Sequence, residues 1–228
     1  MRRLEQLLSS LGYCSRKEAV ILIKAGRVTV DGVPATRADA RVVPSAVSVD
    51  GEPLEYPDGL LVMLHKPVGY VCTHSEGEGP TIYELLPGRW LSRKAVVTSV
   101  GRLDKDTSGL LLITDQGQIV QRHTSPKSES EKVYEAELDG ELTPGLVEVF
   151  ASGTLMLRSE TQPCKPARLE ILSPRCARLT VTEGRYHQVR RMFASQGLKV
   201  VTLHRTRFGP YELGDLPEGE WKDLPLPQ

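Results

Sequence analysis

Residues 101–114 join a polar, aspartate-bearing loop to a short run of apolar residues. The run Leu110–Ile113 is too short for a helix and has no alternation of polar and apolar side chains, which predicts a strand buried on both faces. Residues 95–100 are another strand candidate, so the loop connects two core strands. Rigid sheets commonly hold catalytic carboxylates in such loops. By spacing alone, however, an aspartate at position 104 is more often an ordinary turn residue than a catalytic one.

The loop and the run together read Gly-Arg-Leu-Asp-Lys-Asp-Thr-Ser-Gly-Leu-Leu-Leu-Ile-Thr. This segment resembles motif I of the RsuA/RluA-type pseudouridine synthases, enzymes that isomerise uridine within RNA. The aspartate of that motif is the family's catalytic nucleophile. The resemblance therefore implies this role for Asp104, and not for Asp106 or Asp115. We expect the neighbouring Arg102 to contact RNA.

A second segment of interest, Lys132–Leu138, alternates with a period of two, as a strand does. Tyr134 lies on its less polar face, where a tyrosine is most often simply a core residue. The Lys-x-Tyr pattern also resembles motif II of the same family. There the tyrosine packs against the target base, which implies a catalytic role for Tyr134.

Residues 183–193 read Glu-Gly-Arg-Tyr-His-Gln-Val-Arg-Arg-Met-Phe and predict a helix that begins at Arg185. Arg190 lies on the flank of the apolar face and can reach a buried carboxylate. The segment resembles motif III, whose basic residue pairs with the catalytic aspartate. This implies that Arg190 keeps Asp104 ionised in a closed pocket, where burial alone would raise the pKa of the carboxyl. We expect Arg185 to contact RNA.

The N-terminal residues predict two short helices followed by a hairpin. Leucines recur at helical spacing before Gly12, and Ser15 with Glu18 forms a capping box for a second helix. Asp31-Gly32 is a hairpin turn signal. This order resembles the S4 RNA-binding domain, which grips RNA through basic residues on and after its second helix. The matching positions are Arg16, Lys17, Lys24 and Arg27. The alternative is a solvated helix face.

A polar, proline-bearing segment at residues 52–59 predicts a linker. We therefore expect an S4-like domain with its linker at residues 1–56 and a catalytic domain at residues 57–228. The resemblance implies an α+β fold, with a mixed, largely antiparallel sheet in the catalytic domain. His65 stands where this family more usually has asparagine, so its role stays open.

The segment 200–209 predicts a strand that leads into a basic turn. Arg205 and Arg207 alternate onto one face of it, and we expect both to contact phosphates. The histidines and the four cysteines lack the spacing of a metal site, so we expect no metal and no catalytic histidine. The isomerisation implied by the resemblance needs no cofactor.

The net charge of zero conceals basic segments. Residues 1–41 hold eight Lys or Arg against four Asp or Glu, and residues 180–210 hold six against one. Such local patches suit phosphate contacts. The apolar runs are far too short to span a bilayer, and the N-terminus carries charges where an export signal needs apolar residues. We expect a cytoplasmic monomer without membrane contact.

The expected function is isomerisation of one uridine in small-subunit ribosomal RNA, within a partly assembled particle. Residues 186–188 and 203–205 resemble the family's small-subunit (RsuA) type. Attack at the ribose C1′ or at the ring C6 stays open. One alternative is a large-subunit synthase of the same family. Another is a non-catalytic S4-type RNA-binding or ribosome-assembly protein, whose signature would be a lost aspartate, tyrosine or motif III arginine. A phosphate-processing enzyme would need a glycine-rich phosphate loop, which is absent.

Overall fold

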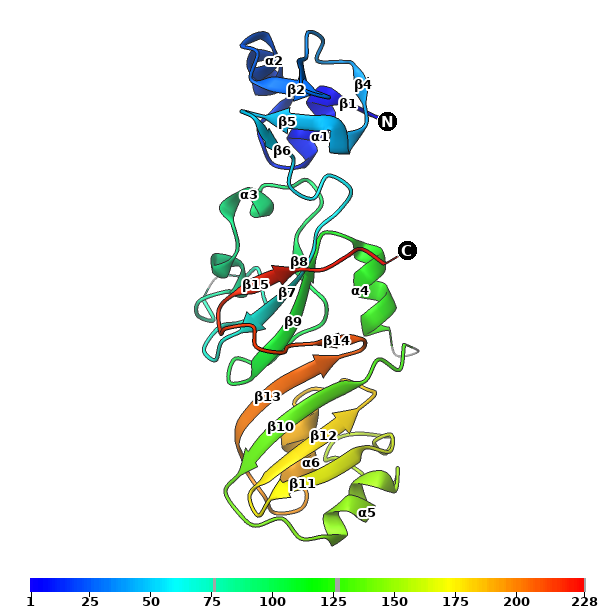
Figure 1. Ribbon diagram of the computed structural model, residues 1–228. Helices are drawn as coiled ribbons and strands as arrows, with labels where there is room; N and C mark the ends of the chain where they lie inside the picture. Colours follow the sequence, from blue (N-terminus) through cyan, green and yellow to red (C-terminus); the bar gives the residue numbers. More distant parts are fainter. Residues whose placement is uncertain (76, 126–127, 228) are drawn as a thin grey trace.

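The computed structural model describes residues 1–75, 77–125 and 128–227. It has the predicted α+β architecture, arranged as three parts along one axis: an N-terminal part and two halves of one large sheet (Figure 1). The N-terminal part has a hydrophobic cluster of its own, within residues 4–54, whereas the residues from Leu60 onward form two further clusters.

The N-terminal part packs two helices, α1 (Leu4–Ser10) and α2 (Arg16–Lys24), against a small antiparallel sheet. The predicted capping box is present: the backbone N–H of Glu18 donates to Ser15 Oγ, and that of Ser15 donates to the Glu18 carboxylate. The strands of this part are β1 (Arg2–Arg3), β2 (Val28–Val30), β3 (Val33–Pro34), β4 (Arg41–Val42), β5 (Val47–Val49) and β6 (Glu52–Pro53). A 3₁₀ turn, η1 (Pro44–Ala46), precedes β5.

The rest of the chain is built on a nine-stranded mixed sheet with the main order β11-β12-β10-β13-β9-β7-β15. One half holds β7 (Leu61–Lys66), β8 (Thr98–Ser99), β9 (Ser108–Thr114) and β15 (Trp221–Asp223). The other half holds β10 (Lys132–Leu138), β11 (Arg168–Ser173), β12 (Cys176–Val181), β13 (Val200–Phe208) and β14 (Tyr211–Glu212). The predicted strand at residues 95–100 is thus only the short β8.

Strand β9 contains the predicted apolar run, and all four residues from Leu110 to Ile113 are fully buried. Leu111 and Ile113 enter one hydrophobic cluster, whereas Leu110 and Leu112 enter another. Apolar residues at every position are therefore required, because both faces of this strand are covered.

The two halves of the sheet meet where β9 and β13 pair in parallel, with Gly109 opposite Arg205. A Cβ atom on Gly109 would lie 2.3 Å from the carbonyl oxygen of Arg205, and its φ of +113° also favours glycine. Glycine at this position therefore allows the close approach of the two backbones that joins the motif I loop to β13.

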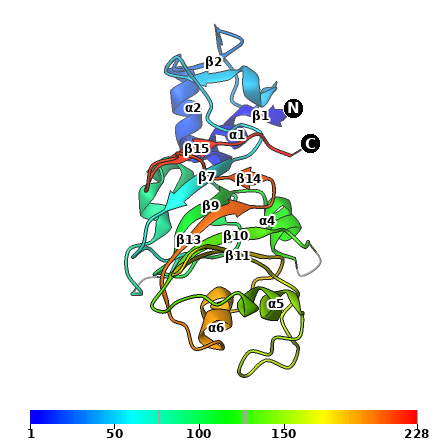
Figure 2. The same ribbon diagram turned by 60° about the horizontal axis from the view of Figure 1, so that its bottom comes forward.

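Helices cover the sheet on different sides of this junction. α5 (Gly145–Ala151) and α6 (Gln188–Ala194) lie against one face of the half that contains β10 to β13 (Figure 2). α4 (Gly117–Thr124) follows β9, and the short η2 (Ile82–Leu85) and α3 (Gly88–Leu91) lie between β7 and β8 in sequence. The predicted apolar face of α6 is buried: Val189, Met192 and Phe193.

Helix α6 begins three residues later than predicted. The segment from Arg185 to His187 is a turn, in which the Gln188 carboxamide oxygen accepts from the backbone N–H of Arg185 and His187 adopts a left-handed conformation (φ 48°). This local side-chain bond offers the backbone an alternative to the first helical turn. The prediction of a helix from Arg185 was therefore wrong at its start.

The N-terminal part contacts the rest of the chain through α3 and the segment after it. Arg89 and Trp90 of α3 donate to the Glu55 carboxylate, and the backbone N–H of Lys94 donates to the carbonyl of Ser10. The Arg89 guanidinium stacks over the Tyr13 ring at 4.6 Å. These contacts hold the N-terminal helices on the sheet half that carries β7 and β9.

Candidate active site

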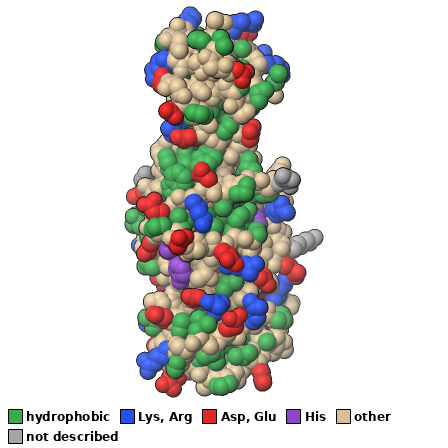
Figure 3. Space-filling view, in the orientation of Figure 1, with side chains coloured by type: hydrophobic (Ala, Val, Ile, Leu, Met, Phe, Trp, Pro, Cys, Tyr) green, Lys and Arg blue, Asp and Glu red, His purple; other side chains and the backbone are tan. Residues whose placement is uncertain are grey.

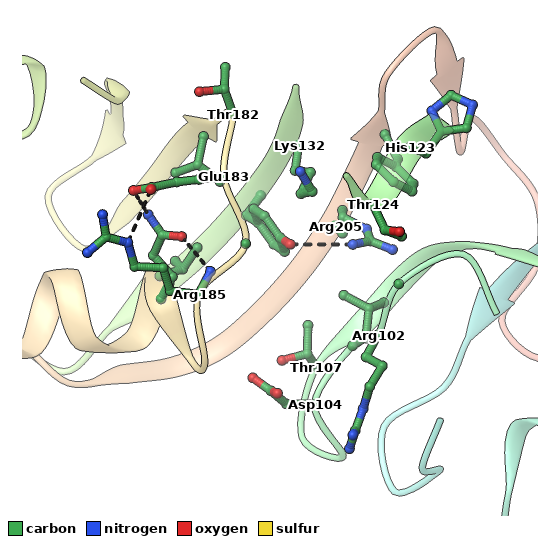
Figure 4. Close-up of a pocket in the computed structure, with 18 of the residues that line it drawn as sticks. Arg102, Asp104, Thr107, His123, Thr124, Lys132, Thr182, Glu183, Arg185 and Arg205 are labelled. Atoms are coloured by element: carbon green, nitrogen blue, oxygen red, sulfur yellow. Dashed lines mark hydrogen bonds and ion pairs between the residues drawn. The ribbon is translucent and has the colours of Figure 1, made fainter. Parts of the chain in front are cut away.

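A cavity of about 410 Å³ lies between the motif I loop and the sheet half formed by β10, β12 and β13 (Figure 4). Its volume falls in the range of small-molecule sites. Six of the residues that line it bear on the chemistry: Asp104, Thr107, Lys132, Tyr134, His187 and Arg205. Segments that are distant in the sequence therefore meet at this cavity, as the three motifs predict.

Asp104 lies on the loop before β9, with its side chain about one-third exposed. The Thr107 backbone N–H donates to the carbonyl of Asp104, and the Gly69 N–H donates to the carbonyl of Lys105, so the loop is fixed on both sides of the carboxylate. The imidazole of His187 lies beside Asp104, with its Nε2 3.3 Å from Oδ1. Sequence reasoning treated His187 as structural and missed this contact.

Arg190 does not form the predicted ion pair with Asp104. Its Nη2 instead donates to the carbonyl of Asp106 and lies 3.1 Å from the Asp106 carboxylate, and its Nη1 donates to the carbonyl of Val200. The helical spacing correctly placed Arg190 toward the motif I loop. The late start of α6 and the second carboxylate of the loop account for the different partner.

Tyr134 is buried on β10 and faces the cavity, as its alternation predicts. Its hydroxyl accepts a long hydrogen bond, 3.4 Å, from Nη1 of Arg205 (dashed in Figure 4). Arg205 is only 2% exposed. This burial argues against the predicted contact of Arg205 with an RNA phosphate, because its guanidinium lies in the cavity wall and not at the surface.

Arg205 and Arg207 do not share a face of β13. A bulge separates them: Arg205 pairs with Tyr134, but Arg207 pairs with Val133, which lies on the opposite face of β10. The extra residue in β13 shifts the alternation by one. Arg207 is partly exposed and donates to the carbonyl of Gly209, outside the cavity. Arg207 therefore stays available as an RNA contact. The sequence prediction assumed a regular alternation of side chains along the strand and so did not include the bulge.

Lys132 lines the cavity two residues before Tyr134, on the same face of β10. Its Nζ donates to the carbonyl of Ser130. Burial, together with the positive charge of Arg205, lowers the pKa of Lys132 to about 8, although the Glu183 carboxylate opposes this shift. The period of two in β10 was the sequence signal that places Lys132 beside Tyr134.

Arg185 is committed to the protein. Its three guanidinium nitrogens donate to the Glu183 carboxylate and to the carbonyls of Gln162 and Pro163. This placement argues against the predicted RNA contact and makes Arg185 a brace for the turn before α6. Arg102, in contrast, is exposed at the edge of the cavity, where the predicted RNA contact is geometrically open.

The basic residues of the N-terminal part that we expect to contact RNA are all exposed, but one of them already has an acidic partner. Arg16, Lys17 and Lys24 are exposed on α2. Arg27 is also exposed, but its guanidinium forms two hydrogen bonds with the Asp50 carboxylate, at 2.7 and 2.6 Å, and these bonds lower the pKa of that carboxyl. The face shown in Figure 3 mixes acidic and basic side chains and has no single continuous basic surface.

The other histidines have protein partners. His123 is buried in the cavity wall against Phe208, and burial lowers its pKa. His65 Nδ1 donates to the carbonyl of Leu216, and its ring lies 5.2 Å from that of His204. Neither His65 nor His204 is among the cavity-lining residues that the structure describes.

The described residues hold no group of three or more His, Cys, Asp or Glu side chains that could bind a metal ion. Within residues 1–75, 77–125 and 128–227, no helix has the length and apolar character needed to cross a membrane.

Comparisons with known proteins agree with the three motifs. The family model described as RNA pseudouridylate synthase matches residues 60–195, and the S4 domain model matches residues 2–48. The chain is 42% identical over 225 residues to the ribosomal small subunit pseudouridine synthase A of Pasteurella multocida, covering 97% of this chain and 95% of that protein. It is 42% identical over 227 residues to the Escherichia coli K12 protein of the same name, covering 97% and 96%.

A solved structure titled as a pseudouridylate synthase has a similar fold over the whole chain. The TM-score is 0.68 at 38% sequence identity, with 99% of this chain and 96% of that chain covered. With an aspartate-bearing loop, a tyrosine and a basic residue gathered at one cavity, the chain belongs to the RNA pseudouridylate synthase family and carries an N-terminal S4 domain.

Proposed function

We propose that this chain isomerises one uridine of small-subunit ribosomal RNA to pseudouridine, with Asp104 as the nucleophile. The observation that carries the proposal is the position of Asp104, whose carboxylate borders a cavity that Tyr134 and Arg205 close on the other side. The names of relatives that match nearly the full length of the chain support the small-subunit substrate.

In the proposed reaction, the target uridine leaves its helix and enters the cavity, which costs a few kcal/mol of lost stacking and pairing. Asp104 attacks either the ribose C1′ or the ring C6. The bond between C1′ and N1 breaks, the uracil turns within the cavity, and C5 forms a bond with C1′. The Asp104 oxygen then leaves, C5 loses its proton and N1 gains one. The reaction is an isomerisation by covalent catalysis, neither oxidises nor reduces the nucleoside, and needs no cofactor.

Each site residue has a proposed role. Tyr134 packs against the base, and Arg190 positions Asp104 indirectly, because it holds the neighbouring Asp106. Exposed Arg102 contacts RNA at the cavity edge. Phosphates of a structured rRNA element are contacted by basic residues of the S4 part and of β13: Arg16, Lys17, Lys24, Arg27 and Arg207.

We further propose a division into an S4-like part with its linker at residues 1–56 and a catalytic part at residues 57–228. The separate hydrophobic cores support this boundary. A single target within a structured rRNA suits a partly assembled small subunit as the substrate, and such a substrate implies a cytoplasmic location. We expect the protein to act as a monomer, because one chain supplies every proposed residue of the cavity.

The experiment is a mass-spectrometric map of pseudouridines in rRNA from cells that lack the protein, with release of tritium from 5-tritiated uridine by the purified protein. Loss of one small-subunit pseudouridine is the expected result. Loss of a large-subunit or tRNA pseudouridine would contradict the substrate but not the chemistry. A protein that binds rRNA and releases no tritium would instead be a non-catalytic assembly factor.

A further inference from the structure

The guanidinium of Arg205 is a buried positive charge with an incomplete set of hydrogen bonds. Its Nε donates to the carbonyl of Leu110 at 2.8 Å, and its Nη1 reaches the Tyr134 hydroxyl. Its Nη2 is buried and has no hydrogen-bond partner within the described parts of the chain. A buried donor on a charged group is costly to leave unpaired, so such an atom requires an explanation.

The fold holds this guanidinium in place. Gly109 lets β13 approach β9 closely enough for Nε to bond the carbonyl of Leu110. The guanidinium carbon also lies 4.9 Å from the centre of the Phe208 ring. Since Nε and Nη1 are paired, Nη2 is the guanidinium nitrogen that the described residues leave without a partner, on a side chain that lines the cavity (Figure 4).

The surroundings favour a ligand with negative charge. No carboxylate forms an ion pair with Arg205 or with Lys132 among the residues that the structure describes, although both cations line one cavity. The Glu183 carboxylate, which also lines it, is engaged by Gln188 and Arg185. Thr107 Oγ1, buried in the same wall, is a second atom for which the described residues offer no partner. Polar, electron-rich atoms of a ligand would satisfy both.

We propose that Arg205 is a catalytic residue: its Nη2 donates to a carbonyl oxygen of the target uracil and stabilises the negative charge that builds on the base during the reaction. The proposal rests on the proposed function, because it takes uridine in RNA as the substrate. It replaces the phosphate contact predicted for Arg205 from the sequence.

The charge arises by either route of attack. If Asp104 attacks C1′, the C1′–N1 bond breaks with its electron pair on N1, and the uracil anion shares this charge between its two carbonyl oxygens. If Asp104 attacks C6, the C5–C6 π pair moves toward O4 and gives an enolate. In the C6 route, too, the C1′–N1 bond then breaks with its electron pair on N1. In both routes C5 bonds C1′, the Asp104 oxygen leaves with its electron pair, the C5 proton goes to solvent or a base, and N1 takes up a proton, so the product is an isomer of uridine. A fixed donor at a developing oxyanion is a strong catalytic device.

A purely structural role for Arg205 predicts something different. An arginine that only ties β13 to Leu110 would, when replaced, slow every substrate by the same factor. A donor to the leaving base would matter less when the base is intrinsically a better anion. 5-Fluorouridine offers this comparison, because fluorine at C5 withdraws electrons and stabilises the uracil anion.

The experiment measures single-turnover loss of the target nucleoside from a small-subunit rRNA fragment that carries either uridine or 5-fluorouridine at the target. The protein variants are wild type, R205Q, R205K and the control R178Q. Arg178 bonds Glu135 on the face of the sheet that points away from the cavity, so R178Q repeats the substitution outside the site. Loss of the starting nucleoside is the readout, because fluorine at C5 blocks the final proton loss.

We expect R205Q to slow uridine conversion by about 100-fold to 1,000-fold, as removal of one oxyanion donor does. We expect its effect on 5-fluorouridine to be smaller by about tenfold or more. R205K, which keeps the charge but not the fork of donors, should lie between R205Q and wild type and show the same substrate dependence. R178Q should differ from wild type by less than about twofold on both substrates.

Equal slowing of both substrates, or unchanged rates, would overturn the proposal. If R205Q does not fold, as judged by circular dichroism, the ratio of the two substrates in R205K decides in the same way. Wild-type activity on uridine is measured first. A wild type that converts no uridine in any rRNA would overturn the proposed function, which separates that failure from failure of the Arg205 proposal.

Discussion

His187 Nε2 and Asp104 Oδ1 lie 3.3 Å apart across the cavity. The contact depends on the left-handed backbone of His187, which turns the chain just before α6, and on the stacking of its ring with that of Tyr186 at 3.9 Å. Tyr186 is 75% exposed, so the pair presents an aromatic ring to solvent next to the cavity-lining His187. The imidazole therefore occupies the position that the motif III arginine was expected to fill.

The first prediction concerns this contact. H187N should keep the backbone, because asparagine tolerates the left-handed conformation, but its shorter side chain loses the 3.3 Å contact with Asp104. We expect single-turnover conversion of the target uridine to fall about 2-fold to 5-fold, which corresponds to at most about 1 kcal/mol for a partly exposed ionic contact. Thermal melting checks that the fold is kept. An unchanged rate would mean that the free-state contact does not persist in the complex.

The second prediction concerns the nucleophile. D104N removes the negative charge from a side chain that is one-third exposed, so the fold should be stable while tritium release from 5-tritiated uridine falls by about a thousandfold or more. RNA affinity, measured by filter binding, should change little, because the S4 part is untouched. A D104N protein that converts uridine at the wild-type rate would contradict the assignment of Asp104.

Sequence reasoning was reliable where local physics decides the outcome. The apolar run at Leu110–Ile113, the alternation at Lys132–Leu138 and the capping box at Ser15 were all predicted and are all present. Each depends on the side chains within a few residues. The prediction that Asp104 and Tyr134 share one site came from the motif resemblance and not from the periodicity.

The errors arose where a few backbone torsions redirect long side chains. The bulge in β13 separates Arg205 from Arg207, and no composition signal marks it. The turn at Arg185–His187 moves His187 toward Asp104 and leaves Arg190 with Asp106. The apolar Leu203, two residues before Arg205, was the one sequence signal that this face of β13 is buried.

The third prediction concerns the junction between the two halves of the sheet. G109A places a methyl group 2.3 Å from the Arg205 carbonyl oxygen at a φ that disfavours alanine, so we expect the free energy of unfolding to fall by about 1–3 kcal/mol. G117A is the control, because nothing lies within 4 Å of a Cβ there and the residue begins α4. Urea unfolding of both variants measures the difference. Equal stability of G109A and G117A would contradict the requirement for close approach.

The fourth prediction concerns RNA binding by the S4 part. The double variant R16E/K17E should weaken rRNA binding and reduce the slope of log affinity against log salt by about two, one for each lost phosphate contact. Conversion of bound RNA in a single turnover at saturating protein should be unchanged. R37E is the control, since Arg37 already pairs with Asp39 and its reversal changes the charge of the same domain elsewhere. A similar loss with R37E would indicate general charge and no local contact.

The last prediction concerns Lys132. Burial, and then the charge of Arg205, lowers the pKa of Lys132 from 10.5 to about 8 in the folded protein. Below about pH 8 the ammonium is charged in both states, and the folded state bears the full cost of burying it. Between about pH 8 and 10.5 the unfolded chain binds more protons than the folded one, so the contribution of this group to stability rises with pH.

Comparison with K132M isolates that contribution, because the other titrating groups are common to both proteins. At about pH 7, K132M should be more stable than wild type by about 1–2 kcal/mol, a value reduced for the partial exposure of the side chain. The difference should shrink as the pH rises to about 9.5, since wild type no longer buries a charge. Urea unfolding at both pH values measures it. If the difference in stability between K132M and wild type is constant or grows with pH, burial does not destabilise the charged form of Lys132.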